Sequence, residues 1–333
     1  MNFYTTLQKL CATPSVSGRE NQIRALLQEK IAPFADELRV DALGNLIALK
    51  KGAGGGKVTM LCAHMDEIGF LVTFIEDSGL LRIAPVGGIH FAASSFAEVI
   101  SEKGTPGVLV PDSGVKAGDY ATDKFAIDIG VKSRKEAERR VAIGDFFVAR
   151  GGVRRLAGKR IAGRPLDDRI GCAVLLSVAE RLASKTLPGD VYYVFSVQEE
   201  VGCRGALTAA FGIAPDYSLC FDVTATGDTP GATAMACSVG GGAAVKIKDS
   251  SVICHEEVVT ALCALAQEKK IPYQREILLR GGTDTSSMQL SGAGSRAGAL
   301  SIPCRYIHSG VELCDLGDAE ACAALATAFV ESL

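Results

Sequence analysis

The stretch that decides the fold reads V-T-M-L-C-A-H-M-D-E and occupies residues 58–67. Its first six residues form an apolar run, which is typical of a strand that is buried on both faces of a sheet. The run stops at His64, so an imidazole stands where the strand is expected to end. Because open parallel sheets bind ligands beyond the carboxyl ends of their strands, His64 is a candidate site residue.

Similar apolar runs return further along the chain, at 191–197, 217–221 and 297–302. Apolar residues at helical spacing lie between them, as at 170–182 and 258–265. Strands that alternate with helices predict an α/β fold. We expect a mixed, largely parallel sheet with helices on both faces.

The segment before the first buried run carries two local signals. Residues 17–20 read S-G-R-E, which has the form of a capping box at the start of a helix. Residues 38–50 look like a hairpin that turns at Gly44-Asn45.

Residues 67–160 differ from the rest of the chain. They carry short strand-like segments, many glycines and one helical segment near 133–141. A chain of 333 residues also exceeds the usual size of one compact domain. We therefore predict a discontinuous catalytic domain, 1–66 plus 161–333, and an inserted β-rich domain at 67–160.

Composition narrows the class of protein. With 48% hydrophobic and 22% charged residues, the chain is expected to be a soluble globular enzyme. A net charge of −3 gives no reason to expect nucleic acid or an anionic membrane as a partner. No signal peptide and no membrane-spanning run are recognised. The 11 cysteines are odd in number and many lie in apolar runs, which indicates a reducing compartment, so we expect a cytoplasmic protein.

Chemically active side chains follow the other predicted strands as well. The pair Glu199-Glu200 follows the second strand, Asp222 the third, and His308 lies on the loop after the fourth. All of them would gather with His64 along one edge of the sheet. Two imidazoles and several carboxylates form a ligand set suited to two neighbouring divalent metals.

Asp167 is the best candidate for a carboxylate shared by both metals. It stands at the start of a predicted helix, where the partial positive charge of the helix favours an anion. The neighbouring Asp168 competes for this role, but we expect it to cap the helix and to pair with Arg169. The other ligands would divide into two sets, His64 with Asp222 and Glu200 with His308.

Glu199 is then left free to act in hydrolysis. As a general base, it would accept a proton from a metal-activated water and then pass this proton to the leaving amine. Asp66, two residues beyond His64, would orient that imidazole or a metal.

A single histidine at a strand end is more often structural than a ligand, so these assignments depend on the whole set converging. No comparable set of candidate ligands accompanies His90 or His255 in the sequence. We expect His255 to lie on the surface near a helix start, and we retain His90 as a possible supporting residue near the metals.

Longer motifs resemble the M42 family of metallo-aminopeptidases from the first helix to the last. They are A-H-M-D-E-I-G-F (63–70), G-R-P-L-D-D-R-I-G-C (163–172), Q-E-E-V-G-C-R-G-A (198–206), D-V-T (222–224), G-G-T-D (281–284) and I-P-C-R-Y-I-H-S (302–309). The resemblance implies a zinc-exopeptidase-like fold and a di-metal enzyme that removes N-terminal residues from short peptides, with zinc or cobalt. It implies the ligands and the roles of Glu199 and Asp66 given above.

The resemblance also bears on the insert and on assembly. It implies that the inserted domain is PDZ-like and shapes dimer contacts, and that dimers build a hollow dodecamer. We further expect Gly282, Thr283 and Asp284 to lie beside the substrate pocket, and Arg280 to favour an acidic first residue.

Two other functions are compatible with the sequence. A deacylase or carboxypeptidase would use the same metal pair, and substrates with free or blocked amino termini would separate it from an aminopeptidase. An inactive assembly protein would keep the fold without binding metal.

Overall fold

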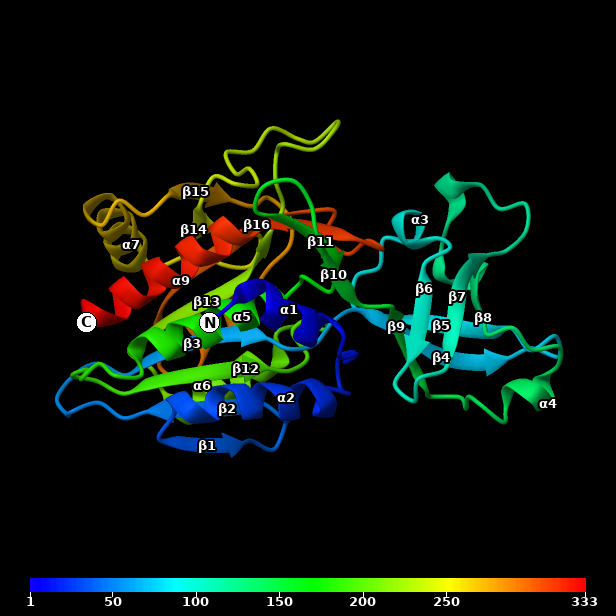
Figure 1. Cartoon of the computed structure of the whole chain (residues 1–333), viewed down its shortest axis with the longest axis horizontal. Coiled ribbons are helices and arrows are strands. Elements are labelled where there is room, and N and C mark those ends of the chain that lie inside the picture. The colour runs from blue at the N-terminus through cyan, green and yellow to red at the C-terminus, as the bar shows by residue number, and fades with distance from the viewer.

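The computed structural model describes residues 1–333. Figure 1 shows two lobes side by side, a large sheet covered by helices and a smaller, mainly β lobe. The small lobe contains a closed barrel of six strands. No helix of the structure combines the length and the apolarity that crossing a bilayer requires.

The large sheet has 11 strands and is mixed, as predicted. Its centre is parallel and consists of β12 (Val191–Ser196), β3 (Thr59–His64), β13 (Tyr217–Thr224) and β16 (Arg296–Arg305). The flanks are antiparallel and consist of β1 (Glu37–Val40), β2 (Leu46–Lys50), β17 (Glu312–Asp315), β11 (Arg160–Arg164) and β10 (Gly152–Arg155). Beside β16 lie β14 (Ala243–Lys248) and β15 (Tyr273–Ile277). The prediction of a largely parallel sheet is therefore wrong outside the centre and the β14–β15 pair.

Helices cover both faces of this sheet, as predicted. In β3, Leu61 and Ala63 face one core while Met60 and Cys62 face the other, because side chains alternate along a strand. The first core is covered by α1 (Phe3–Cys11), α2 (Asn21–Ile31), α5 (Arg169–Leu182), α7 (Glu256–Glu268) and α9 (Leu316–Glu331). The second is covered by α6 (Arg204–Ile213) and α8 (Thr285–Leu290). Burial on both faces explains why the central strands are continuous apolar runs.

The barrel has a hydrophobic core of its own. Its strands are β4 (Gly69–Ile75), β5 (Leu81–Val86), β6 (Glu98–Ser101), β7 (Pro106–Pro111), β8 (Phe125–Asp128) and β9 (Phe146–Ala149). Two short helices, α3 (Phe91–Ser94) and α4 (Arg134–Ala137), accompany it. Within 67–160, residues 152–155 form β10 and pair with β11, so this segment extends the large sheet instead of the barrel.

The four central strands bring the candidate residues to one edge. His64 is the last residue of β3 and lies opposite Ser196, the last residue of β12. Asp222 lies inside β13, which runs three residues further than the apolar pattern indicated. Because these strands are parallel, their carboxyl ends and the turns that follow them meet at the same edge.

The predicted capping box at residues 17–20 is wrong. Helix α2 begins at Asn21, and Glu20 caps it without a side-chain hydrogen bond. The Ser17 hydroxyl instead donates to Asp66 Oδ2 at 2.7 Å, and Glu20 accepts from the backbone N–H of Gly18 and of Gln198. The side chains of Ser17 and Glu20 therefore bind other groups, including partners at the strand ends, and do not form the hydrogen bonds of a capping box.

Arg169 at the start of α5 is fully buried and holds three segments together. Its guanidinium donates to the backbone carbonyls of Leu10 and Met65 and to Ser15 Oγ. Its carboxylate partner is Glu67, at 3.4 Å, and not the neighbouring aspartate that we expected. One planar group with five donors can satisfy acceptors in several directions, which suits arginine to this position.

Replacing Arg169 with lysine is expected to destabilise the protein by about 2–3 kcal/mol, because a lysine keeps the charge but loses most of these hydrogen bonds. The shift in the urea midpoint at constant m-value measures the effect. Arg181→Lys is the matched control, since Arg181 pairs with Glu320 near the surface and should change stability by less than about 1 kcal/mol. Equal shifts in both variants would contradict the proposed importance of the buried network.

Candidate metal centre

Asp167 lies between the two histidines that the sequence singled out. Its Oδ1 atom is 3.0 Å from His64 Nε2, and its Oδ2 atom is 3.2 Å from His308 Nε2. The two imidazoles follow different strands, since His64 ends β3 and His308 follows β16, and only β13 lies between these strands in the sheet. One carboxylate thus faces a different imidazole with each of its oxygens.

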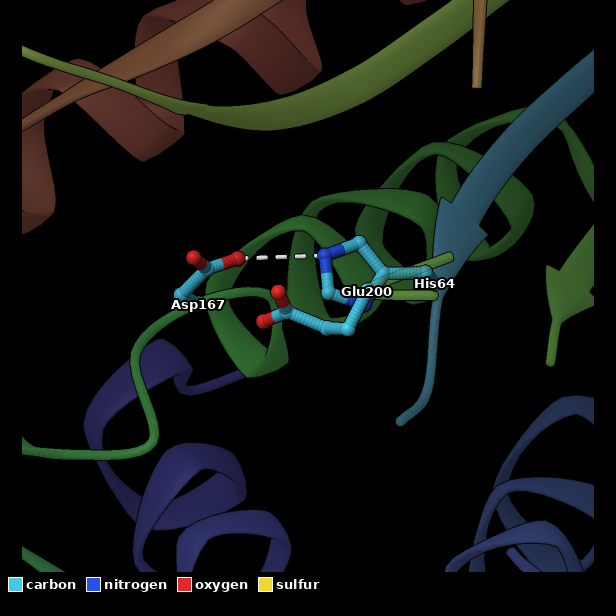
Figure 2. Close-up of side chains that lie close together, drawn as sticks. All are labelled: His64, Asp167 and Glu200. Atoms are coloured by element: carbon cyan, nitrogen blue, oxygen red, sulfur yellow. Dashed lines mark hydrogen bonds and ion pairs between the residues drawn. The ribbon is translucent and has the colours of Figure 1, made fainter. Parts of the chain in front are cut away.

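Glu200 completes the side of the centre that holds His308. Its Oε2 atom lies 3.1 Å from His308 Nε2. Figure 2 shows how Glu200, from the turn after β12, and Asp167, from the segment before α5, approach His64. One ligand atom from each of these three residues lies within 4.8 Å of the others.

Asp222 and Asp168 form a second group with His64. The Oδ1 atom of Asp222 is 3.8 Å from His64 Nε2, and ligand atoms of His64, Asp168 and Asp222 form a second group within 4.8 Å. Asp168 caps α5 as predicted, because its Oδ1 accepts a hydrogen bond from Gly171 N–H at 3.0 Å. Its other oxygen is buried and has no hydrogen-bond partner.

These residues fit divalent metal ions. Imidazole nitrogens and carboxylate oxygens are the donors that zinc and related ions take in proteins, and two overlapping groups of three are present. The unpartnered Asp168 oxygen supports the same conclusion, since a buried carboxylate oxygen without a partner is costly. The arrangement can therefore hold metal ions at the edge of the sheet.

The charged groups of the centre shift the pKa values of one another. Burial opposes protonation of His308, but its contacts with Asp167 and Glu200 raise its pKa to about 11. Burial would raise the pKa of Asp167, yet hydrogen bonds from the two histidines hold it below the usual value. Burial raises the pKa of Asp222 well above its ordinary value although His64 is close. The histidines thus stabilise the negative charge of Asp167, whereas burial disfavours a negative charge on Asp222.

Asp66 supports the centre more broadly than the sequence indicated. It contacts His64, as predicted, with its backbone oxygen 3.2 Å from Nδ1. Its carboxylate also accepts from Ser17 Oγ and from the backbone N–H of Glu199 and of Glu200, at 3.0 and 3.2 Å. Asp66 therefore fixes both the imidazole and the turn that carries the glutamate pair. Ser17 was missed because only its long-range partner reveals its role.

Glu312 is a second supporting residue that the sequence did not reveal. Its Oε2 accepts from the backbone N–H of Leu166 at 2.6 Å and of Asp167 at 3.1 Å. Arg164 lies 3.6 Å from the other Glu312 oxygen and donates to the carbonyl of Ser309 at 2.6 Å. The pair thus ties the segment before Asp167 to the loop that carries His308. Glu312 lies on β17, a strand too short to show a clear pattern.

A cavity of about 670 Å³ opens over the centre. Glu199 lines it, together with all five predicted ligands. One wall comes from the turn after β5, where a Cβ added to Gly88 would lie 3.2 Å from His308 Nδ1. Glycine at this position therefore lets the turn approach the imidazole closely.

The four predicted substrate residues separate into two groups. Arg280 and Gly282 line the cavity, while Thr283 and Asp284 are buried beneath it with 1% of their surface exposed. Four serines that the sequence did not suggest also line it, namely Ser250, Ser251, Ser286 and Ser287.

The other two histidines stay outside the cavity wall. The ring of His90 is exposed and accepts from Ala93 N–H at 3.2 Å, while its backbone N–H donates to the carbonyl of His308. His255 stands exposed at the start of α7, as predicted.

Comparison with known proteins links this geometry to a family. The sequence profile described as M42 glutamyl aminopeptidase matches residues 44–325. The lysyl aminopeptidase of Pyrococcus furiosus is 35% identical over 343 residues, covering 98% of this chain and 96% of that protein.

Solved structures give the same picture. An aminopeptidase from the archaeon Desulfurococcus kamchatkensis has a TM-score of 0.95 at 36% identity, covering 99% of this chain and 95% of that chain. The TET1 peptidase of Pyrococcus horikoshii, described as assembling into a tetrahedron or a large octahedral shell, has a TM-score of 0.87 at 34% identity and covers 100% of both chains.

Proposed function

The chain belongs to the M42 family of aminopeptidases, and from this premise we propose that it hydrolyses the N-terminal residue from short peptides with two divalent metal ions per subunit. The observation that carries the proposal is the position of Asp167, whose two oxygens face His64 and His308 separately. A carboxylate shared between two metals needs this arrangement.

These contacts support the ligand assignment. His64 and Asp222 would hold one ion, Glu200 and His308 the other, and Asp167 both. Asp168 is less suited to the shared position because one of its oxygens already caps α5. Zinc or cobalt bound here would supply Lewis-acid activation of water and of the peptide carbonyl.

Glu199 is the proposed general base. It lines the cavity without an ion pair to either histidine, and its backbone N–H is held by Asp66. Burial raises its pKa well above the usual value, with Asp222 and Asp284 adding to the effect and His64 opposing it. A carboxylate with a raised pKa accepts a proton readily, so Glu199 would take the proton of the attacking water and deliver it to the leaving amine.

The polar loops around the cavity are proposed to orient the peptide. Gly282 and Arg280 line its wall, and the Arg280 guanidinium would favour an acidic first residue by charge. Thr283 and Asp284 would act from below by fixing the loop, since the Thr283 hydroxyl donates to Thr285 Oγ1 at 2.8 Å.

A panel of aminoacyl chromogenic substrates with added zinc, cobalt or manganese tests the function. We expect metal-dependent release from substrates with a free amino terminus, and loss of activity with a chelator. The same sequences carrying an N-acetyl group are the control and should not be cleaved. Preferential cleavage of the acetylated or carboxyl-terminal bond would instead identify a deacylase or carboxypeptidase.

We also propose the division of labour implied by the family. The catalytic domain would be formed by 1–66 and 161–333. The inserted domain at 67–160, which contains the barrel and from which only β10 joins the large sheet, would act as a PDZ-like dimerisation domain. Dimers would assemble further into a dodecamer, and the tetrahedral or octahedral assembly described for the TET1 peptidase supports a large homo-oligomer. Eleven cysteines without a disulfide agree with a cytoplasmic protein.

A further inference from the structure

A second cluster of metal-binding side chains lies next to the proposed general base. Glu199, Cys203 and Asp284 each place a ligand atom within 4.8 Å of the others. They come from three segments, the turn after β12, the start of α6 and the start of α8. Neither Cys203 nor Asp284 belongs to the ligand set proposed for the metal pair.

Cys203 differs from the other cysteines of the chain. The other ten are buried, whereas Cys203 is partly exposed and lines the cavity. Its Sγ atom donates to Glu199 Oε1 at 3.2 Å. A ligand that enters the cavity therefore meets this thiol beside the general base.

Asp284 provides independent support for a ligand. Its side chain is 1% exposed, and its Oδ2 atom accepts from Ser196 Oγ at 2.5 Å and from Cys62 Sγ at 3.6 Å. Its Oδ1 atom is buried and has no hydrogen-bond partner. A buried carboxylate oxygen without a partner is costly, and a cation bound between Asp284 and its two neighbours would remove that cost.

The dimensions of the cluster suit one ion. Zinc lies about 2.3 Å from sulfur and about 2.0–2.2 Å from oxygen, so in tetrahedral geometry two of its ligand atoms are about 3.3–3.8 Å apart. The three ligand atoms lie within 4.8 Å of one another, so side-chain shifts of about 1 Å would bring them onto one ion. Glu199 and Cys203 line the cavity, so water in the cavity would supply the fourth ligand.

We propose that Glu199, Cys203 and Asp284 form a third cation site, which binds a thiophilic divalent ion such as zinc and thereby inhibits the enzyme. Thiolate ligands favour zinc, cadmium and cobalt over magnesium and manganese. Binding forms a metal–sulfur bond and releases the thiol proton to solvent, with no oxidation or reduction. The inhibitory effect rests on the proposed function, because an ion held by Glu199 prevents that carboxylate from accepting the proton of water.

Absorption spectroscopy with cobalt separates this site from the metal pair. None of the five residues proposed for the pair carries sulfur, so a thiolate-to-cobalt charge-transfer band reports the third site alone. Titration of the metal-free full chain with cobalt should give this band in the wild type and not in Cys203→Ser. Cys263→Ala, which removes a buried thiol on α7, is the control and should keep the band. A wild type that is loaded with cobalt yet lacks the band, or a Cys203→Ser variant that keeps it, would overturn the site.

Asp284→Asn provides a second variant of similar shape. We expect it to weaken cobalt binding at the third site by roughly 10–100-fold, seen as a shift of the titration midpoint of the band. An unchanged midpoint would remove Asp284 from the site.

Activity assays test the inhibitory role. Zinc in excess over the pair should lower wild-type turnover by roughly 10²–10⁴-fold at saturation, the usual worth of a positioned base. Excess manganese should not lower turnover. The Cys203→Ser variant should keep most of its own uninhibited turnover when excess zinc is added. Equal inhibition of both proteins by zinc would refute the regulatory role. A wild type that shows the band with cobalt but cleaves no peptide with manganese, which leaves the third site empty, would uphold the third site and reject the proposed function.

Discussion

Glu199→Gln is expected to lower kcat by roughly 10²–10⁴-fold while the protein keeps its two metal ions. Glutamine has the shape of glutamate but cannot accept a proton from water, so the substitution removes the chemistry and little else. The turn should stay in place, because Asp66 holds it through the backbone N–H groups of Glu199 and Glu200 and not through the Glu199 side chain. Steady-state kinetics together with elemental analysis of bound metal measure both quantities.

Two further substitutions distinguish loss of the general base from loss of metal. Glu200→Gln changes the neighbouring residue, which contacts His308, and is expected to lower metal content as well as turnover. Glu268→Gln at the exposed end of α7 should change neither. If Glu199→Gln turns over substrate at the wild-type rate, Glu199 is not the general base and another group must take the proton.

The sequence was sufficient for the centre of the sheet and for the residues at its edge. Three apolar runs form strands that are buried on both faces, and such strands appear in the sequence as unbroken apolar residues. The first run ends at His64, the second precedes Glu199, and the third leads into Asp222. Once they are recognised as parallel neighbours, their carboxyl ends must share one edge. His308 follows from the same argument, because it comes after β16.

The flanking strands could not be predicted in this way. β17 and β10 have four residues each, so alternation has too little length to be recognised. β14 places the buried Lys246 in its middle, and this is tolerated only because Lys246 forms an ion pair with Glu276 on β15. A charged residue within an apolar run argues against a buried strand unless the ion-pair partner of that residue is known.

Supporting residues of the site were hidden for a related reason. Ser17 and Glu312 act by binding groups 49 and about 145 residues away in the chain. No local pattern records such contacts, and in Ser17 the local pattern was misleading because it matched a capping box. Cys203 likewise reads as one more apolar cysteine until the turn after β12 places it against Glu199.

Asp167→Asn tests the centre itself, and we expect it to reduce metal content and to lower kcat by roughly 10³-fold or more. An asparagine side chain offers one oxygen where the aspartate offers two, and its uncharged amide is a poor ligand. Only one of the two histidines could then share a metal with residue 167, although both contact Asp167 now. Metal analysis after dialysis against a weak chelator, combined with kinetics, measures the loss.

Asp168→Asn is the matched control for this substitution. Asparagine caps helices as well as aspartate does, so α5 should stay intact, and turnover should fall by less than about tenfold. The reverse result, in which Asp168→Asn loses metal while Asp167→Asn keeps two ions and full turnover, would assign the shared position to Asp168. The unpartnered buried oxygen of Asp168 makes this the specific alternative to exclude, because it is the other carboxylate close to both His64 and Asp222.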